Sequence, residues 1–411
     1  FPIFHLYIIN YLNKNRMLTL LFYTRYHCVP SKGGTEHTTI TVAKKLLEDY
    51  DIHSISTFTR DFPGEANCFD AEYKLSKNKK EATEKIRNII SKHNVDFVII
   101  QGYFHEIDIF RHAIKDNSKC HLIFTHHFNP GWEQLKRGEV DEKIKRSKGY
   151  KRIKYRVKLK LFPIFLKLNK YNLSKRYRSA YRYSDKVVLL SNGYIDKFEK
   201  LGHFYDHSKF CVIPNALSFT SSFDMANYSE KEKTVLIVSR LDERQKRIHL
   251  ALDIWKQVKK NKALKDWRLQ IVGDGDRPCV KEYINWSKEN KIPEVEFFGR
   301  KLPLPFYQKA SVFMMTSACE GLPLTILEAQ QQAVVPIVFD TFDSIHDIIN
   351  SGQNGYIINE TNKDSYIEAL EDLLLNDDLR KAMAECGLTI QQKFSKEVIM
   401  KKWIEMFKEM V

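Results

Sequence analysis

The chain has 411 residues, of which 43% are hydrophobic and 28% are charged, a composition typical of soluble globular proteins. At roughly 150 residues per domain, this length predicts two or three domains. The 16 glycines and 12 prolines are too few for a collagen-like or low-complexity protein, and the seven cysteines form no Cys-x-x-Cys pair. These counts disfavour a disulfide framework and a structural zinc site, and they favour a reducing compartment.

The net charge of +15 comes from one segment, residues 143–182, because the rest of the chain is close to neutral. This segment contains sixteen basic residues and no Asp or Glu. The basic residues are Lys143, Lys145, Arg146, Lys148, Lys151, Arg152, Lys154, Arg156, Lys158, Lys160, Lys167, Lys170, Lys175, Arg176, Arg178 and Arg182.

Residues 1–12 (FPIFHLYIINYL) are apolar but shorter than the ~20 residues that cross a bilayer. Lys14 and Arg16 follow this run, whereas a secretory signal peptide carries its positive charge before the apolar run. Met17 stands directly before a strand-like run. We therefore expect the natural product to begin at Met17, with residues 1–16 as an upstream extension.

Short apolar runs alternate with amphipathic runs between residues 17 and 217, which we interpret as an N-terminal domain. Strands are predicted at Leu18–Thr24, Ile52–Phe58, Phe97–Gln101, His121–Thr125, Lys186–Leu190 and Phe210–Ile213. Helices are predicted at Thr35–Asp49, Lys80–His93 and Ile107–Asp116. This alternation predicts βαβ units around a parallel sheet, whose strands are covered on both faces and are therefore apolar throughout.

The second half repeats the scheme after a polar segment, residues 218–233, which we interpret as a linker. Strands are predicted at Thr234–Val238, Leu269–Val272, Val295–Phe298, Val312–Thr316, Val335–Phe339 and Tyr356–Ile358. Helices are predicted at His249–Lys260, Val280–Lys288, Pro323–Gln331, Ile345–Asn350, Ser365–Leu375, Asp377–Cys386 and Lys396–Met410. The chain is thus expected to form two doubly wound α/β domains. We expect the second domain to comprise residues 234–393. A C-terminal helix within residues 394–411 is expected to pack back towards the first domain.

Glu320 and Glu328 bracket a loop that enters a helix, Glu-Gly-Leu-Pro-Leu-Thr-Ile-Leu-Glu. Gly321 permits a tight turn, and Pro323 suits the first helical turn. Backbone amides near Leu324 should then face outward at the positive end of the helix dipole, which is a ready anion site. Taken alone, the same spacing also fits a solvated loop glutamate and an exposed helix glutamate.

Arg240 and Lys246 lie between a predicted strand and a predicted helix, where a guanidinium and an ammonium could clamp a diphosphate. A solvated basic turn paired with Asp242 and Glu243 is the alternative. Ligands of open parallel sheets bind at the carboxyl ends of the strands, which is where these residues are expected.

Two N-terminal features occupy similar positions. The pair Gly33-Gly34 follows the first strand and would let a ligand approach backbone amides, although a plain tight turn fits as well. No GxGxxG or GK[ST] motif accompanies it, so a nicotinamide or P-loop site is not supported. His126 stands at the end of a predicted strand, where it could hydrogen-bond a sugar, and His127 is the alternative.

The sequence Gly273-Asp274-Gly275-Asp276 has the form of a DxD metal motif. It directly follows a predicted strand, and its carboxylates suit the routine roles of turn former and helix N-cap. A single DxD without further carboxylates is weak support for a hard cation. We therefore predict no metal site here.

Four of these segments, taken in order, resemble the retaining, nucleotide-sugar-dependent glycosyltransferases of family 4, which have the GT-B fold. The pair Gly33-Gly34 resembles that family's N-terminal glycine loop, and Arg240 with Lys246 resembles its diphosphate-binding pair. Glu320 and Glu328 match its E-x7-E element, and residues 351–356 (SGQNGY) resemble the turn and strand that follow. The resemblance covers Met17 to the end and is strongest from about 234 to 356.

The resemblance implies a role for each matching residue. Arg240, Lys246, Gly33 and Gly34 would bind the donor diphosphate, Glu328 the ribose, and Glu320 the hydroxyls of the transferred sugar. His126 would lie near the reacting centre. Backbone contacts to sugar or phosphate would come from Gly321, Leu322, Pro323 and Leu324. No metal or other cofactor is needed beyond the nucleotide-diphosphate sugar, because side chains and a helix end would stabilise the leaving group.

This sequence departs from the family pattern in the donor loops. Arg247 stands where a Gly commonly follows the Lys, and the Gly-Gly pair expected after the strand Val335–Phe339 is missing. Asp347 replaces the Glu that accompanies that pair. These changes affect the shape of the donor loops and hence the choice of sugar.

The implied activity is transfer of a sugar, with retention, to a lipid-linked glycan in surface polysaccharide or lipopolysaccharide-type synthesis. The N-terminal domain would then bind the acceptor. In residues 143–182, basic residues alternate with apolar ones, which predicts docking on an anionic membrane, so the protein would be cytoplasmic and associated with the inner face of the membrane. A solvated basic helix pair is the plainer reading. The competing functions are a nucleotide-sugar epimerase, a glycan phosphorylase, or a nucleic-acid-binding protein that uses the basic segment.

Overall fold

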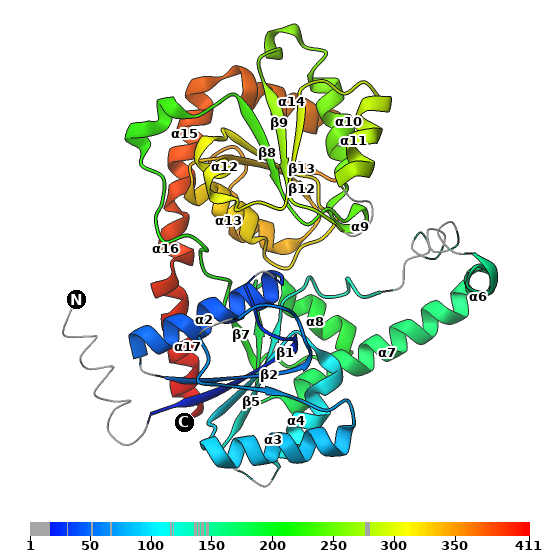
Figure 1. Cartoon of the computed structure of the whole chain (residues 1–411), viewed down its shortest axis with the longest axis vertical. Coiled ribbons are helices and arrows are strands. Elements are labelled where there is room, and N and C mark those ends of the chain that lie inside the picture. The colour runs from blue at the N-terminus through cyan, green and yellow to red at the C-terminus, as the bar shows by residue number, and fades with distance from the viewer. Residues whose placement is uncertain are drawn as a thin grey trace. The chain divides into compact units, whose positions relative to one another are not determined.

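A computed structural model describes residues 17–411 except 31, 51, 66–67, 116, 118, 135–137, 139, 141–143, 145–147 and 276–279. The chain divides into two compact units (Figure 1). Unit 1 holds residues up to Val212 together with 409–411, and unit 2 holds Ile213–Lys408. Each unit is an α/β layer structure with its own parallel sheet, as the alternating sequence pattern predicts.

The sheet of unit 1 has the strand order β3-β2-β1-β4-β5-β6-β7, and every pair in it is parallel. Its strands are β1 (Thr19–Tyr26), β2 (His53–Arg60), β3 (Ala71–Lys74), β4 (Phe97–Gln101), β5 (His121–His126), β6 (Lys186–Leu189) and β7 (Phe210–Val212). Its helices are α2 (Gly34–Tyr50), α3 (Lys79–His93), α4 (Ile107–Ile114), α6 (Gly149–Lys160), α7 (Phe162–Tyr183) and α8 (Tyr194–Gly202).

Local signals in unit 1 account for these boundaries. Asn78 caps α3 by accepting hydrogen bonds from the amides of Lys80 and Glu81, and Asn94 ends the helix in the left-handed conformation with φ 50°. Strand β4 is buried along its whole length and β5 along all but its first residue, as expected of parallel strands covered on both faces. Strand β3 is a short polar edge strand (AEYK), so the apolar runs used for prediction missed it.

The sheet of unit 2 has the order β10-β9-β8-β11-β12-β13 and is also parallel. Its strands are β8 (Thr234–Val238), β9 (Arg268–Val272), β10 (Val295–Gly299), β11 (Val312–Met315), β12 (Val335–Asp340) and β13 (Tyr356–Asn359). Its helices are α9 (Glu243–Lys246), α10 (Ile248–Val258), α11 (Val280–Glu289), α12 (Leu304–Lys309), α13 (Leu324–Gln331), α14 (Lys363–Leu375), α15 (Asp377–Gly387), α16 (Gln391–Phe394) and α17 (Lys396–Met410).

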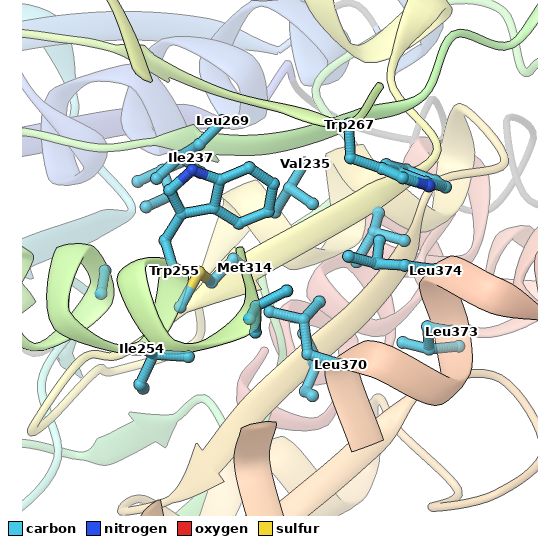
Figure 2. Packing of buried hydrophobic residues seen from close by; sticks show 14 of the residues in the cluster. Val235, Ile237, Ile254, Trp255, Trp267, Leu269, Met314, Leu370, Leu373 and Leu374 are labelled. Atoms are coloured by element: carbon cyan, nitrogen blue, oxygen red, sulfur yellow. The ribbon is translucent and has the colours of Figure 1, made fainter. Parts of the chain in front are cut away.

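Trp255 lies at the centre of the unit 2 core, between the sheet and the helices that cover it (Figure 2). Its ring is fully buried, and its Nε1–H donates to the carbonyl of Pro293 at 2.9 Å. Ile237 and Leu269 come from the sheet, and Leu370 comes from α14. The cluster includes side chains of β8, β9, β11 and β12, and the loops that follow β8 and β11 carry the predicted site.

Residues 218–233, predicted as a linker, lie within unit 2 and are hydrogen-bonded to it. The amide of Phe223 donates to the carbonyl of Gln331 at 3.0 Å, and Gln332 Nε2 donates to the carbonyl of Ser221 at 2.8 Å. Lys231 Nζ donates to the carbonyls of Tyr307 and Gln332. The polar composition that suggests a linker thus reflects contacts with the end of α13.

Candidate functional site

The candidate donor site of unit 2 lies where strands β8 and β11, neighbours in the sheet, end and lead into helices. Four residues form α9 after β8, and Asp242 caps it by accepting from the amide of Gln245 at 3.2 Å. Arg240 precedes the cap with a side chain that is 68% exposed, and its Nη2 donates to Gln245 Oε1 at 3.3 Å. Its guanidinium is therefore presented to solvent at the carboxyl edge of the sheet.

Lys246 and Glu320 form an ion pair, with 2.5 Å between Nζ and Oε1. The pair is largely shielded, since the two side chains are 14% and 10% exposed. Gln245 Nε2 donates to the other carboxylate oxygen of Glu320 at 3.3 Å and to the carbonyl of Cys319 at 3.1 Å. The structure thus brings together two residues that the sequence assigned to different parts of the donor, and it fixes the Glu320 carboxylate through both of its oxygens.

Arg247, which replaces the common glycine, ties the two loops together. It adopts a left-handed backbone conformation with φ 49°. Its guanidinium donates to the carbonyls of Thr316 (2.6 Å) and Ser317 (3.1 Å) and to Glu360 (2.8 Å). In return, the Thr316 hydroxyl donates to the carbonyls of Lys246 and Arg247. This reciprocal clamp holds the end of β11 against the turn after α9, directly beside the Lys246–Glu320 pair.

Gly273 and Gly275, on either side of Asp274, have a packing role that the sequence did not reveal. A Cβ on Gly273 would lie 1.8 Å from the carbonyl oxygen of Ser239, and one on Gly275 would lie 1.9 Å from that of Leu241. Asp274 Oδ1 accepts from the amide of Gly275 at 2.8 Å, which is the turn role that the sequence indicates. Asp276 lies outside the described residues. Within the described ranges, no group of three or more His, Cys, Asp or Glu could hold a metal ion.

Helix α13 begins after Pro323, whose side chain makes no capping hydrogen bond. The amides of Ile326 and Leu327 bond to the carbonyl of Pro323, while those of Leu324 and Thr325 belong to the first turn, which has no intrahelical acceptor. Gly321 is half-buried and Leu322 is buried, and the Leu322 carbonyl accepts from Asn215 Nδ2 at 3.4 Å. An uncapped, positive helix end therefore follows Glu320 in the chain.

Glu328 lies on α13 and is buried, with 9% of its surface exposed. Burial raises the pKa of its carboxyl, and the nearby hydroxyls of Ser218 and Tyr307 oppose that rise. Tyr307 also donates to the carbonyl of Thr325 at 3.1 Å, so it anchors the first turn of the helix. Neither Tyr307 nor Gln245 was selected from the sequence, because nothing in their local spacing marks them.

In unit 1, Gly33 and Gly34 stand at the start of α2, and both are exposed. A Cβ on Gly34 would meet nothing within 4 Å, so packing does not require a glycine there. Glu36, in the first turn of α2, is 5% exposed, and burial raises the pKa of its carboxyl while Lys32 lowers it. The glycine loop thus leaves open space over the amino end of α2.

His126 is the predicted histidine of the reacting centre, and that role stays a prediction. Its side chain is completely buried at the end of β5. The rings of Phe104, Phe128, Tyr177 and Phe198 surround it, and its Nε2 lies 3.6 Å from Glu133 Oε1. Burial raises the pKa of Glu133, but hydrogen bonding and the charge of His126 outweigh burial and leave that pKa lowered. In this structure His126 contacts Glu133, in the loop after β5, and Tyr177 of α7.

His127, the alternative, is half-buried and lies in that loop. Its Nε2 is hydrogen-bonded to Gln101 Oε1, and its ring packs 3.7 Å from the position of a Cβ on Gly102, which has φ 79°. Burial, with a smaller effect of His126, lowers the pKa of His127 to about 3. His127 thus keeps a neutral imidazole at the carboxyl end of β5, and it remains the alternative to His126.

Residues 219–388 match the family model described as "Glycosyl transferases group 1". Among curated proteins, the chain is 29% identical to the amylovoran biosynthesis glycosyltransferase AmsD of Erwinia amylovora, over 54% of this chain and 62% of that one. It is 22% identical to an uncharacterized glycosyltransferase of Haemophilus influenzae, over 91% of this chain and 96% of that one. It is 27% identical to the UDP-Gal:alpha-D-GlcNAc-diphosphoundecaprenol alpha-1,3-galactosyltransferase of Escherichia coli, over 42% of this chain and 48% of that one.

Two solved structures show the same fold over nearly the whole chain. HepE of Anabaena, in complex with UDP and glucose, has a TM-score of 0.69 at 15% identity and covers 95% of this chain and 100% of its own. The lipopolysaccharide outer core galactosyltransferase WaaB, in its apo form, has a TM-score of 0.68 at 16% identity, over 96% and 100%. The fold is thus GT-B, as predicted. The matched region spans less than two thirds of the Erwinia and Escherichia coli proteins.

Proposed function

We propose, from the premise that residues 219–388 form a group 1 glycosyltransferase domain, that the chain is a hexosyltransferase. It moves a sugar from a nucleotide-diphosphate sugar to a lipid-linked glycan in surface polysaccharide or lipopolysaccharide-type synthesis. The names of the relatives support this class, because they specify amylovoran synthesis in one case and transfer to a diphosphoundecaprenol-linked sugar in another. The reaction would take place at the inner, cytoplasmic face of the membrane.

The observation that carries the proposal is the Lys246–Glu320 ion pair beside the uncapped start of α13. Arg240 and the amides at the start of α13 supply positive charge for a diphosphate, and Lys246 shares its charge between that diphosphate and Glu320. Glu320, held through both oxygens, accepts hydrogen bonds from sugar hydroxyls. Glu328, buried on the same helix, is assigned to the ribose.

In the proposed reaction, the bond between the anomeric carbon and the donor diphosphate oxygen breaks, and the diphosphate leaves with the electron pair. A bond forms from the acceptor hydroxyl oxygen to the same carbon on the same face, so configuration is retained. The hydroxyl proton passes to the departing phosphate oxygen. Arg240, Lys246 and the end of α13 stabilise the negative charge that develops on that oxygen, which is the usual largest contribution to catalysis.

The test is an assay of purified protein with a panel of nucleotide sugars and a native membrane extract as acceptor source. Transfer to a lipid-extractable product, reduced by about a hundredfold in Glu320→Gln, supports the proposal. Three results would contradict it: interconversion of the nucleotide sugar without an acceptor, phosphate-dependent release of sugar from a glycan, and tight binding to single-stranded nucleic acid with no sugar transfer. These correspond to an epimerase, a phosphorylase and a nucleic-acid-binding protein.

A further inference from the structure

The described part of the basic segment forms two helices, α6 and α7, and neither α6 nor the first part of α7 has a buried residue. No residue of α6 is buried, and the first buried residue of α7 is Leu173. We refer to residues 149–172 as the basic helix pair. Figure 1 shows α6 and the first part of α7 extending away from the sheet of unit 1. The second part of α7 is anchored, since Tyr177 and Ala180 are fully buried.

Each helix of the pair carries an exposed apolar stripe. On α6 the stripe is Tyr150, Ile153 and Val157, exposed by 79%, 61% and 50%. The stripe of α7 begins at Leu161, directly before the helix, and continues with Ile164, Leu168 and Tyr171. These four side chains are 41% to 69% exposed. The spacing of three and four residues places each set on one face of its helix. Such a concentration of exposed apolar side chains on a soluble protein indicates an interaction surface.

The charges around the stripes are all of one sign. Residues 148–182 contain basic side chains and no Asp or Glu. On α6, Lys154 and Lys158 lie to one side of the stripe, and Arg156 and Lys160 lie to the other. Long basic side chains in this arrangement can reach past an apolar surface to anionic groups at its border. The surface therefore combines apolar burial with attraction to negative charge.

We propose that the basic helix pair docks on the surface of an anionic lipid bilayer, with its stripes in the interface between headgroups and acyl chains. Within the described residues no helix could span a membrane, so the contact proposed is interfacial. Basic residues bring the surface to the lipid, and the stripes add short-range burial that salt does not remove. This inference concerns a surface outside the donor site and does not depend on the proposed reaction.

Other occupants match only part of the surface. A second copy of the chain would place two sets of positive charge against each other without a carboxylate from this segment to offset them. A single-stranded nucleic acid would match the charge and could stack on Tyr150 and Tyr171, but Ile153, Val157, Ile164 and Leu168 offer it no stacking surface. A bilayer with anionic headgroups matches both the charge and the aliphatic side chains.

The first experiment measures co-sedimentation of the full chain with vesicles of phosphatidylcholine, with and without phosphatidylglycerol. We expect binding to the anionic vesicles only, weakened by added salt. Reversal of three charges (Lys154→Glu, Lys158→Glu, Lys160→Glu) should weaken binding by about tenfold or more. The matched control reverses three exposed lysines of unit 2 (Lys262→Glu, Lys265→Glu, Lys281→Glu) and should bind like the wild type. Equal binding to neutral and anionic vesicles would overturn the electrostatic part of the proposal.

The second experiment tests insertion of the stripe. Tryptophan replaces Ile164 on the stripe in one variant and Lys170, on the opposite side of α7, in another. On anionic vesicles, brominated lipid should quench the added fluorescence of Ile164→Trp and not that of Lys170→Trp. The double variant Ile164→Gln, Leu168→Gln should bind vesicles more weakly than the wild type. The matched control replaces two exposed leucines outside the stripe, Leu302 (83% exposed) and Leu375 (54% exposed), with Gln and should bind like the wild type.

Three outcomes would overturn the proposal. Equal quenching of the two tryptophans would show that the stripe does not enter the lipid. Salt-sensitive binding to a single-stranded oligonucleotide without vesicle binding would assign the surface to nucleic acid. Concentration-dependent dimerisation that Leu168→Gln abolishes, again without vesicle binding, would assign it to a second copy of the chain.

Discussion

The Lys246–Glu320 pair joins two loops that are 74 residues apart in the chain. The sequence singled out both residues, because a basic pair and an acidic pair at the ends of predicted strands are visible locally. It could not show that they meet, since their contact depends on β8 and β11 being neighbours in the sheet. For the same reason it missed Gln245 and Tyr307, whose roles come only from what they contact.

We expect Glu320→Gln to lower kcat by about a hundredfold while changing nucleotide-sugar affinity little, because the carboxylate is proposed to act mainly in the transition state. Glu328→Gln should instead weaken binding of the donor. Steady-state kinetics and calorimetric titration with the nucleotide separate the two effects. Wild-type kinetics in both folded variants would disprove the assigned roles.

Arg247→Met should lower turnover by about tenfold or more through misplacement of Lys246 and Glu320, because it removes the donors to the carbonyls of Thr316 and Ser317. Arg244→Met is the matched control, since Arg244 is exposed on the same short helix. Arg247→Lys should rescue only part of the activity, because an ammonium cannot reproduce the planar set of donors. Equal activity of Arg247→Met and Arg244→Met would remove the positioning role.

The pKa of His127, lowered to about 3, predicts a pH dependence of stability. Unfolded chains protonate histidine near pH 6.5, whereas the folded chain resists protonation until about pH 3, so stability falls as the pH drops through this window. Lowering the pH from 7 to 5 should reduce the unfolding free energy of the wild type more than that of His127→Gln. The difference between the two proteins should be at most about 2 kcal/mol. Denaturant titrations of both proteins at the two pH values measure this difference, and identical pH profiles would contradict it.

At the scale of elements, the sequence pattern located most strands to within about two residues, because a strand buried on both faces is apolar along its length. It failed for β3, which is a polar edge strand, and for residues 345–350, where a 3₁₀ segment at Asp343–Asp347 replaces the predicted helix. It correctly placed His126 at the end of a strand, but it could not show that the side chain is buried there. A strand's last residue can be buried when a loop folds over it, and the Glu133–Tyr177 contacts hold such a loop here.

The uncapped start of α13, with Arg240 and Lys246, predicts sugar transfer that continues in EDTA. Fixed positive groups can take the place of a divalent cation in stabilising a departing diphosphate. Measuring initial rates with and without EDTA, after dialysis against chelator, tests this. Complete loss of activity, restored by Mg²⁺ or Mn²⁺, would bring Asp274 back as a candidate ligand.

At the scale of the whole molecule, the two units have separate sheets and separate cores. Trp255→Ala should therefore destabilise unit 2 by about 3–5 kcal/mol and leave the unfolding of unit 1 unchanged. Hydrogen exchange under native conditions can follow the amides of β9 and β4 separately. Equal loss of protection in the two strands would show that the units unfold together.

Helix α7 serves two regions of unit 1 at once. Its exposed part carries Leu168, and its anchored part carries Tyr177, whose hydroxyl contacts Glu133 and the amide of Gly131. Tyr177 follows Leu168 by nine positions, which corresponds to about 14 Å of continuous helix. Because α7 is one continuous helix from Phe162 to Tyr183, the element that carries the exposed apolar side chains also supplies the Tyr177 hydroxyl that holds the loop after β5.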